Sequence, residues 1–416
     1  MENPHPTGTE LRKSEIIGHL KAPSTPDKTL PQIPIEAPYT AEGQRKRLDY
    51  LASLRNASLD HLAGKKTFEH HADLQGNIEN FVGMTQVPTG VIGPVAIHGS
   101  AAQGDYFIPL ATSEGALVAS YGRGGKATRL AGGITSICLS EGVQRSPVFR
   151  FEQIRDIGPF ISWVLEHLEK FRAITAQNSR FARLEDLRTN IEGNHVILIF
   201  EFTTGDAAGQ NMVTLCTEAI CRYLLEHCPT KPVQWYIESN YSGDKKATAL
   251  AFTHVRGKKV SAEVTLPRSV VKETLKTTPE RMADYWQAST LAVIQSGAIG
   301  AQGHVANGLA ALFLACGQDV ACISEASIGV PRMELTSGGD LYASVTLPGL
   351  IVGTVGGGTS LPTQRECLEL LGCAGQGGAR VFAEVCGAVA LAGEISIAAA
   401  LSAGHFAQAH RQLGRK

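Results

Sequence analysis

The chain has 416 residues, enough for two or three domains of about 150 residues each or for one large domain carrying an insertion. Its 38 Lys and Arg residues almost balance its 39 Asp and Glu residues, giving a formal net charge of −1. This balance argues against nucleic acid or an anionic membrane as the main partner, because both attract a surplus of basic charge. With 43% hydrophobic residues, the chain can bury a large core.

The N-terminal third combines a polar tail with helix and loop signals. Residues 1–40 are rich in Pro, Thr and Ser and predict a mobile tail. Leucines at helical spacing predict an amphipathic helix over 42–62. The segment 79–99 is interrupted by Gly and Pro, so we expect a loop with short strands, and 116–131 predicts a helix.

The middle of the chain reads as a compact α+β unit of about 90 residues. In order, its apolar runs predict a strand at 148–151, a helix at 160–174, a strand at 196–202, a helix at 211–227 and a strand at 233–237. We predict that 147–236 is a small domain inserted in a large domain made of 41–146 and 237–416.

The remaining elements belong to the predicted large domain. Strands are expected at 260–266 and 341–347, and long helices at about 279–316, 363–373 and 377–404. Residues 288–318 contain no charged side chain, but their Gln, His and Asn residues and many small residues favour a helix in a soluble core over a membrane span. We therefore expect no membrane partner.

The cysteines and the N-terminus indicate a cytoplasmic protein. The nine Cys residues are odd in number and form no Cys-x-x-Cys pair, so we expect buried reduced thiols. The first 15 residues lack the apolar core of a signal peptide.

Several familiar catalytic motifs are absent from the sequence. The stretch Gly122–Lys126 lacks the first Gly and the final Ser or Thr of a phosphate-binding P-loop. No Gly-x-Gly-x-x-Gly fingerprint follows a strand, and no Gly-x-Ser-x-Gly elbow occurs. No His or Cys spacing predicts a metal site.

Four short clusters carry candidate chemistry. Glu114, in Ala111–Gly115, either complements a helix N-terminus or is a semi-buried acid with a raised pKa. The segment Asn240–Lys246 is either a charged surface loop or the source of a lysine that polarises a carbonyl.

The other two clusters lie further along the chain. Asp319 follows the uncharged stretch, and a carboxylate at a helix C-terminus opposes the helix dipole, which invites a functional explanation. Gly353–Thr359 either forms a common turn or exposes backbone N–H groups that cradle phosphate.

Together these motifs resemble those of the 3-hydroxy-3-methylglutaryl-CoA reductase family over residues 42–416. The matching stretches, in the family's order, are ENFVGMTQVPTGVIGP (79–94), ATSEG (111–115), TGDAAGQNM (204–212), DKK (244–246), GQD (317–319) and GTVGGGT (353–359). The resemblance implies an α+β fold: a large domain around a long central helix, with an inserted small ferredoxin-like domain that binds the nicotinamide cofactor. It also implies a homodimer or larger homo-oligomer whose subunits share the active site.

The resemblance further implies the reaction and the catalytic residues. The family reduces (S)-3-hydroxy-3-methylglutaryl-CoA to mevalonate and CoA with two NADPH, through mevaldyl-CoA and mevaldehyde. Glu114 matches the acid, Lys245 the cation that stabilises the oxyanion, and Asp319 the carboxylate between them, so we expect all three to converge. Two histidines, His405 and His410, are candidates for protonating the CoA thiolate, and their spacing favours His410.

Further binding positions follow by motif match. The implied cofactor-binding residues are Ser179, Arg180, Phe181, Asp206, Gly209, Asn211, Met212, Gly356, Gly357, Gly358 and Arg415. Arg180 and Arg415 favour NADPH over NADH, since a guanidinium suits the 2′-phosphate. The implied substrate-binding residues are Arg145, Lys246, Asn307, Glu79 and Asn80.

Two positions depart from the animal and plant members of the family. Glu238 stands where those members have Ser, and Gln287 where they have Lys, and both positions contact the substrate's terminal carboxylate there. This leaves two alternatives to the main interpretation: a reductase of the same fold acting on a different acyl-CoA thioester, or a non-catalytic relative that binds CoA or nicotinamide.

Overall fold

The computed structural model describes residues 8–18, 20, 32–55, 57–254 and 256–404. The helices are α1 (Gly8–Gly18), α2 (Ala41–Arg55), α3 (Leu117–Leu130), α4 (Ile157–Glu166), α5 (Leu168–Asn178), α6 (Gln210–His227), α7 (Arg268–Val270), α8 (Pro279–Ser296), α9 (Val305–Ala315), α10 (Ile323–Ala326), α11 (Pro362–Leu371) and α12 (Gly378–Ser402). The strands are β1 (Thr89–His98), β2 (Gln103–Ala111), β3 (Thr135–Arg145), β4 (Val148–Arg150), β5 (Arg183–Glu192), β6 (His195–Thr203), β7 (Gln234–Tyr236), β8 (Gly257–Leu266), β9 (Val330–Leu335) and β10 (Leu341–Leu350). This confirms the predicted mixture of helices and sheet.

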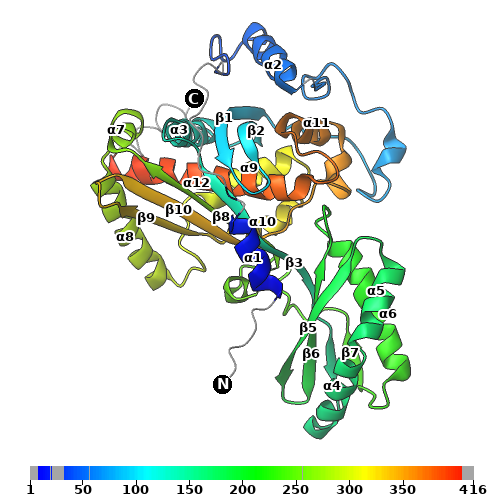
Figure 1. Cartoon of the computed structure of the whole chain (residues 1–416). Helices are drawn as coiled ribbons and strands as arrows, with labels where there is room; N and C mark the ends of the chain where they lie inside the picture. Colours follow the sequence, from blue (N-terminus) through cyan, green and yellow to red (C-terminus); the bar gives the residue numbers. More distant parts are fainter. Residues whose placement is uncertain (1–7, 19, 21–31, 56, 255, 405–416) are drawn as a thin grey trace.

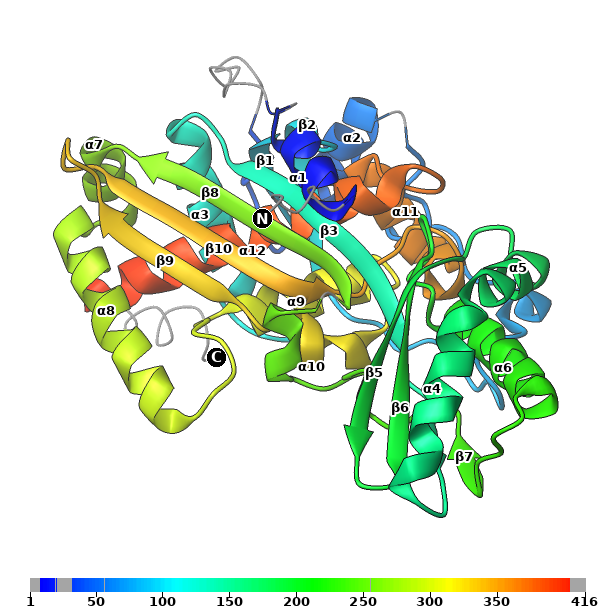
Figure 2. The same ribbon diagram turned by 60° about the horizontal axis from the view of Figure 1, so that its bottom comes forward.

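One antiparallel sheet runs through most of the molecule. Its strand order is β7-β4-β6-β3-β8-β10-β9, with β5 on the other edge of β6. The strand β3 joins its two parts, because residues 135–142 pair with β8 and residues 143–145 pair with β6. Figure 2 shows β3 passing from the long strands of the large part into the smaller part.

The smaller part has its own hydrophobic core, built from buried residues between Val143 and Cys228. Its elements follow the order β4, α4 and α5, β5, β6, α6, β7, and its four strands lie in the order β7-β4-β6-β5. This is the βαββαβ topology of ferredoxin-like folds. The helices α4, α5 and α6 gather on one face of these strands (Figure 1).

The larger part is organised around α12, which lies across β8 and β10 (Figure 1). Among the described residues, α12 is the one helix long and apolar enough to cross a membrane, but 89% of its most apolar window is buried inside the protein. Its apolar composition therefore serves the core, as expected for the central helix of a globular domain.

Two buried glutamates on α12 accept hydrogen bonds from backbone N–H groups of neighbouring segments. Glu384 is fully buried and accepts hydrogen bonds from the backbone N–H groups of Ala101 and Ala102, at 2.9 and 2.7 Å. Glu394 accepts from Gly303 and His304, at 2.9 and 2.6 Å, at the N-terminus of α9. A carboxylate satisfies the unpaired N–H groups there and complements the positive end of the helix dipole.

Several predicted elements were wrong in their boundaries. The single helix expected at 279–316 is two helices, because Gly297 and Gly300 adopt positive φ angles of 73° and 86° that end α8. The segment 79–99, expected to be a loop with short strands, contains one ten-residue strand, β1, which pairs with β2. The helix expected at 160–174 is split into α4 and α5 at His167.

The N-terminal predictions also need correction. The helix expected at 42–62 is the shorter α2, which ends at Arg55. The tail predicted over 1–40 contains α1, so its described part is not without regular structure.

The crossing of α3 and α12 yields a stability prediction. A Cβ added at Gly124 would lie 1.9 Å from the backbone oxygen of Ala392, so Gly124→Ala forces the two helices apart. We expect it to lower the free energy of unfolding by about 1–3 kcal/mol in denaturant titration. Gly122 lies in the same helix, but its Cβ would meet only Ile92, at 3.6 Å. Gly122→Ala should therefore leave stability unchanged or raise it by up to about 1 kcal/mol; equal losses in both variants would contradict this account.

Candidate active site

Lys245 and Asp319 form the clearest functional pair of the structure. The Lys245 Nζ lies 2.9 Å from Asp319 Oδ2, and both side chains remain nearly half exposed. The hydrogen bond that Lys245 donates to Asp319 raises the pKa of Lys245, so the ammonium stays protonated to a higher pH. These two residues are part of the set of three that the resemblance expects to converge.

The placement of Asp319 differs from the sequence interpretation. The helix α9 ends at Ala315, and Asp319 instead precedes a 3-10 turn at Val320–Cys322, where its Oδ1 accepts from the Ala321 N–H at 3.0 Å. The carboxylate therefore caps the N-terminus of a turn and does not oppose a helix dipole.

Glu114 pairs with a different residue. The Asn307 Nδ2 donates to Glu114 Oε2 at 2.8 Å, and Glu114 itself is exposed just before α3. Beside this pair, the ring of Tyr121 packs against the ring of His304 at 4.8 Å between centroids. Burial lowers the pKa of His304, while the charge of Glu114 opposes that shift.

The two pairs lie at opposite ends of α9. Asn307 is in its first turn and Asp319 follows its last turn, and a rise of about 1.5 Å per residue puts the two ends of the helix more than about 12 Å apart. Within the described part of the chain, no hydrogen bond or ion pair joins Glu114 to Lys245 or Asp319. One chain thus brings together two of the three residues expected to converge, and holds the third elsewhere.

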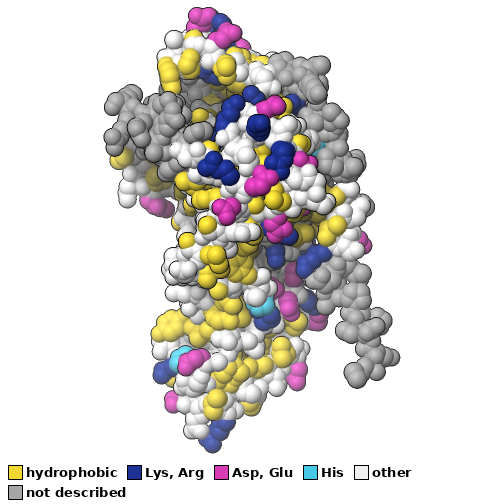
Figure 3. All heavy atoms as spheres, turned by 90° about the vertical axis from the view of Figure 1, so that its left-hand side faces the viewer, with side chains coloured by type: hydrophobic (Ala, Val, Ile, Leu, Met, Phe, Trp, Pro, Cys, Tyr) yellow, Lys and Arg dark blue, Asp and Glu magenta, His cyan; other side chains and the backbone are white. Residues whose placement is uncertain are grey.

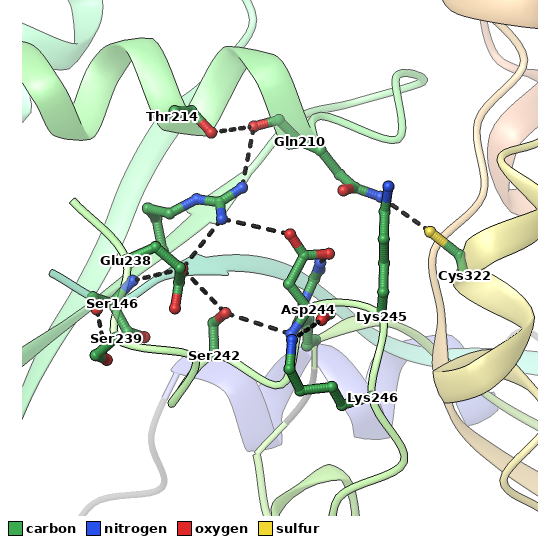
Figure 4. A network of polar contacts seen from close by, with 12 residues as sticks. Ser146, Gln210, Thr214, Glu238, Ser239, Ser242, Asp244, Lys245, Lys246 and Cys322 are labelled. Carbon is green, nitrogen blue, oxygen red and sulfur yellow. Dashed lines mark hydrogen bonds and ion pairs between the residues drawn. The ribbon is translucent and has the colours of Figure 1, made fainter. Parts of the chain in front are cut away.

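A cluster of charges lies beneath the loop that carries Lys245 (Figure 4). The Arg145 guanidinium is buried and pairs with Glu238 at 3.0 Å and with Asp244 at 3.4 Å. Ser242 adds a hydrogen bond to Glu238 at 3.1 Å. Burial works to raise the pKa of Asp244, but Arg256 and Arg145 outweigh it and lower that pKa overall. Arg145 is therefore already shared by two carboxylates and does not stand free for a ligand.

Three of the matching motifs meet at one place. Gln318 donates to the backbone oxygen of Gly353 and accepts from its N–H, both at 2.9 Å. The N–H of Thr354 donates to the backbone oxygen of Asp206 at 2.8 Å. The stretches 204–212, 317–319 and 353–359, far apart in the sequence, are thus adjacent in the structure.

Asp206, expected to bind the cofactor, is engaged within the protein. Its two carboxylate oxygens accept the N–H groups of Gly377 at 2.7 Å and Ala379 at 3.1 Å, at the start of α12. Its side chain therefore holds the first turn of the central helix.

The expected cofactor residues that belong to the smaller part lie at one of its ends. The register of β5 and β6 pairs Arg183 with Thr203, which brings the loop containing Ser179 and Phe181 beside the 204–209 loop. Arg180 and Phe181 are exposed, and the Arg180 guanidinium lies over the Phe181 ring at 5.8 Å. Gly209, with φ 83°, precedes α6, and its first turn contains Asn211 and Met212.

The remaining predicted residues are exposed or lie outside the described residues. Lys246 is exposed, and its Nζ donates to the backbone oxygen of Asp244 at 2.7 Å. Gln287 is exposed on α8, and Glu79 and Asn80 are exposed in the segment before β1. The segment 356–358, with Gly356 and Gly357 at positive φ, follows the motif contact at Gly353. His405, His410 and Arg415 lie outside the described residues.

Sequence reasoning missed four residues that shape the site. Tyr121, His304, Arg256 and Glu325 act through burial and long-range contacts. No motif marks them, because their partners are distant in sequence. Only their residue type could have pointed to them in the sequence, since charged side chains are seldom fully buried without a partner.

The Lys245–Asp319 pair gives a test independent of activity. Asp319→Asn removes the charge that raises the pKa of Lys245, so that pKa should fall. NMR titration of the ¹³C-methylated lysines measures it directly. Asp105→Asn is the control, since Asp105 pairs with Arg129 in another part of the fold. An unchanged Lys245 titration in Asp319→Asn would rule out the pairing in solution.

Comparison with known proteins places the chain among reductases. The sequence profile described as hydroxymethylglutaryl-coenzyme A reductase matches residues 43–415. A 3-hydroxy-3-methylglutaryl-coenzyme A reductase of Pyrococcus abyssi is 43% identical over 366 residues, covering 86% of this chain and 89% of the relative. The enzyme of the same name from Methanothermobacter thermautotrophicus is 39% identical, covering 90% and 94%.

Solved structures agree on the fold. The class II 3-hydroxy-3-methylglutaryl-CoA reductase from Streptococcus pneumoniae, bound to NADPH in open conformations, has a TM-score of 0.69 at 20% sequence identity, covering 86% of this chain and 96% of that one.

Proposed function

Because this chain belongs to the hydroxymethylglutaryl-coenzyme A reductase family, we propose that it reduces (S)-3-hydroxy-3-methylglutaryl-CoA to mevalonate and free CoA, consuming two NADPH. The observation that carries this proposal is the Lys245–Asp319 pair, in which Asp319 directly follows Gln318, the residue that contacts Gly353 of the 353–359 motif. The free, buried cysteines support a cytoplasmic location.

Lys245 is the group that stabilises the oxyanion. As hydride reaches the carbonyl carbon, negative charge develops on the oxygen, and an ammonium held in place stabilises that charge without reorganisation. Asp319 keeps Lys245 protonated and oriented. The exposure of both side chains leaves the ammonium accessible to a substrate.

Glu114 supplies the proton to the nascent alkoxide, and we place it in the same site through a second copy of the chain. Two features support a site shared between subunits: the opposite positions of the two pairs on α9, and apolar side chains that are left open to solvent. Near the Glu79–Asn80 segment, Val82 is fully exposed, and on α8 Leu291 and Ile294 are about two-thirds exposed. Figure 3 shows hydrophobic side chains on the face of the molecule around α8. Burying such groups against a partner is favourable.

The cofactor residues fit a nicotinamide dinucleotide with a 2′-phosphate. The N-terminus of the 18-residue helix α6 has no side-chain cap, so its N–H groups are available to a diphosphate. The exposed Arg180 suits the 2′-phosphate, and Arg415 is proposed beside it. When bound, NADPH supplies the hydride. Gly356–Gly358 would pack against it, and His410 would protonate the departing CoA thiolate, with His405 as the alternative.

The shared site predicts complementation between two inactive variants. Glu114→Gln and Lys245→Ala should each lose most of kcat. Mixed dimers, however, carry one site with both wild-type residues. After unfolding and refolding the two variants together, about a quarter of the wild-type rate should return. The oxidation of NADPH is followed by its absorbance, and each variant refolded alone is the control. No recovery in the mixture would place both residues in one subunit's site.

Glu238 is the reason to test a second class of substrate, acyl-CoA thioesters without the distal carboxylate. Because Glu238 engages Arg145, the substrate's distal carboxylate would rely on Lys246, with Asn307 coming from the second copy of the chain that also supplies Glu114. We expect 3-hydroxy-3-methylglutaryl-CoA to be the preferred substrate in a panel of acyl-CoA thioesters. A value of kcat/KM about tenfold higher for a thioester without the distal carboxylate would assign the chain to a different acyl group. Absence of turnover with every thioester would instead indicate a binding protein.

A further inference from the structure

Glu325 is a buried carboxylate that no step of the proposed reaction uses. It lies on the short helix α10, and only 4% of it is exposed. Its Oε1 accepts a hydrogen bond from the backbone N–H of Lys245 at 3.0 Å. Its Oε2 forms an ion pair with Arg256 Nε at 3.4 Å.

The peptide unit that Glu325 holds has an uncommon conformation. Lys245 has a φ of 57°, in the left-handed region that side chains other than Gly seldom adopt. Such a conformation persists only where the surroundings fix it. Arg256 contributes a second restraint, because it also pairs with Asp244, the residue before Lys245.

One short segment therefore fixes both ends of Lys245. Asp319 binds the ammonium, and Glu325, six residues later, binds the backbone N–H. The 3-10 turn at Val320–Cys322 and the start of α10 connect them, so the two carboxylates are held in a fixed relation. A change at Glu325 would move the ammonium without touching it.

We propose that Glu325 is a positioning residue that fixes the left-handed backbone of Lys245, so that its ammonium is aimed at the carbonyl oxygen being reduced. This inference rests on the reductase activity proposed above. It adds a residue that contacts neither substrate nor cofactor and acts through Lys245.

The charge state of Glu325 supplies a specific readout. Burial raises the pKa of Glu325 to about 7, against the opposing effect of Arg256. The other groups facing it are Asp244 and Lys245 from the loop and the Cys322 thiol from its own segment. Below pH 7 the carboxyl becomes neutral and its ion pair with Arg256 is lost. Wild-type kcat should therefore rise with pH through this range.

The test compares Glu325→Gln with the wild type across pH 5.5 to 8.5. At pH 8 we expect kcat to fall on the order of 10- to 100-fold, as for a misplaced catalytic group. The KM for NADPH should change less than about twofold, because Glu325 touches no cofactor motif. The rise of kcat near pH 7 should disappear in the variant, and wild-type kcat at acid pH should approach the variant's value.

Glu366→Gln is the matched control. Glu366, on α11, is also a buried carboxylate, and it accepts hydrogen bonds from the backbone N–H groups of His61 and Leu62. It should keep the wild-type kcat and pH profile. Should Glu325→Gln fail to fold, Glu325→Asp, which is one methylene too short to reach both partners, should show an intermediate loss of kcat.

The outcomes separate this inference from the proposed function. An inactive wild type refutes the reductase activity. The positioning role alone is refuted by a different set of results. In that case the wild type is active and Lys245→Ala is inactive, but a folded Glu325→Gln or Glu325→Asp keeps the wild-type kcat and pH profile.

Discussion

The capping of α9 by the buried carboxylate of Glu394 is the constraint on which the candidate site depends. Glu394 belongs to the central helix α12 and accepts the N–H groups of Gly303 and His304. An uncapped helix N-terminus in a dry interior would leave donors unpaired, at a cost of about 1–3 kcal/mol each. This contact fixes α9 against α12 and so fixes the positions of both ends of α9. The Glu114–Asn307 pair lies at one end and the Lys245–Asp319 pair follows the other, so their positions depend on the same contact. The rigid helix between these two pairs is one reason for our proposal that another subunit completes the site.

Burial divides the charged residues of the site into two kinds. Lys245, Asp319 and Glu114 are exposed enough to meet a ligand; Lys245 and Asp319 pair with each other, and Glu114 pairs with Asn307. Arg145, Arg256, Asp244 and Glu325 are largely withdrawn from water and pair among themselves or with Glu238. Breaking a buried pair leaves an uncompensated charge, which is far more costly than losing an exposed one. The buried set is therefore suited to holding the loop, and the exposed set to chemistry.

The sequence predicted what depends on motif and on local pattern. The contact between Lys245 and Asp319 agrees with the family resemblance carried by the DKK and GQD motifs. The pattern over 148–237 anticipates β4, β6, α6 and β7 of the smaller part, but it misses the strand β5 and joins α4 and α5 into one helix. The sequence did not predict the break between α8 and α9, because the apolar composition continues through the glycines that end the first helix. Nor did it predict the sharing of β3 between the two parts, or the partners of Glu325, since strand pairing and burial depend on residues far away in the chain.

Glu238 departs from the family pattern, and its presence changes the roles expected for the neighbouring residues Arg145 and Lys246. An isolated acid in a pocket for a carboxylate would repel the ligand, but Glu238 points to Arg145 and Ser242, so its charge is already balanced. The same ion pair also neutralises the positive charge of Arg145, so Arg145 is not a free cation for a ligand. Of the expected substrate residues, Lys246 is the exposed cation beside Lys245, and its ammonium is bound only to a backbone oxygen of the described chain. We therefore propose that an ammonium takes the place of a guanidinium in recognising the distal carboxylate, and an ammonium is a point charge with less directional demand. Such a pocket would discriminate by charge more than by geometry.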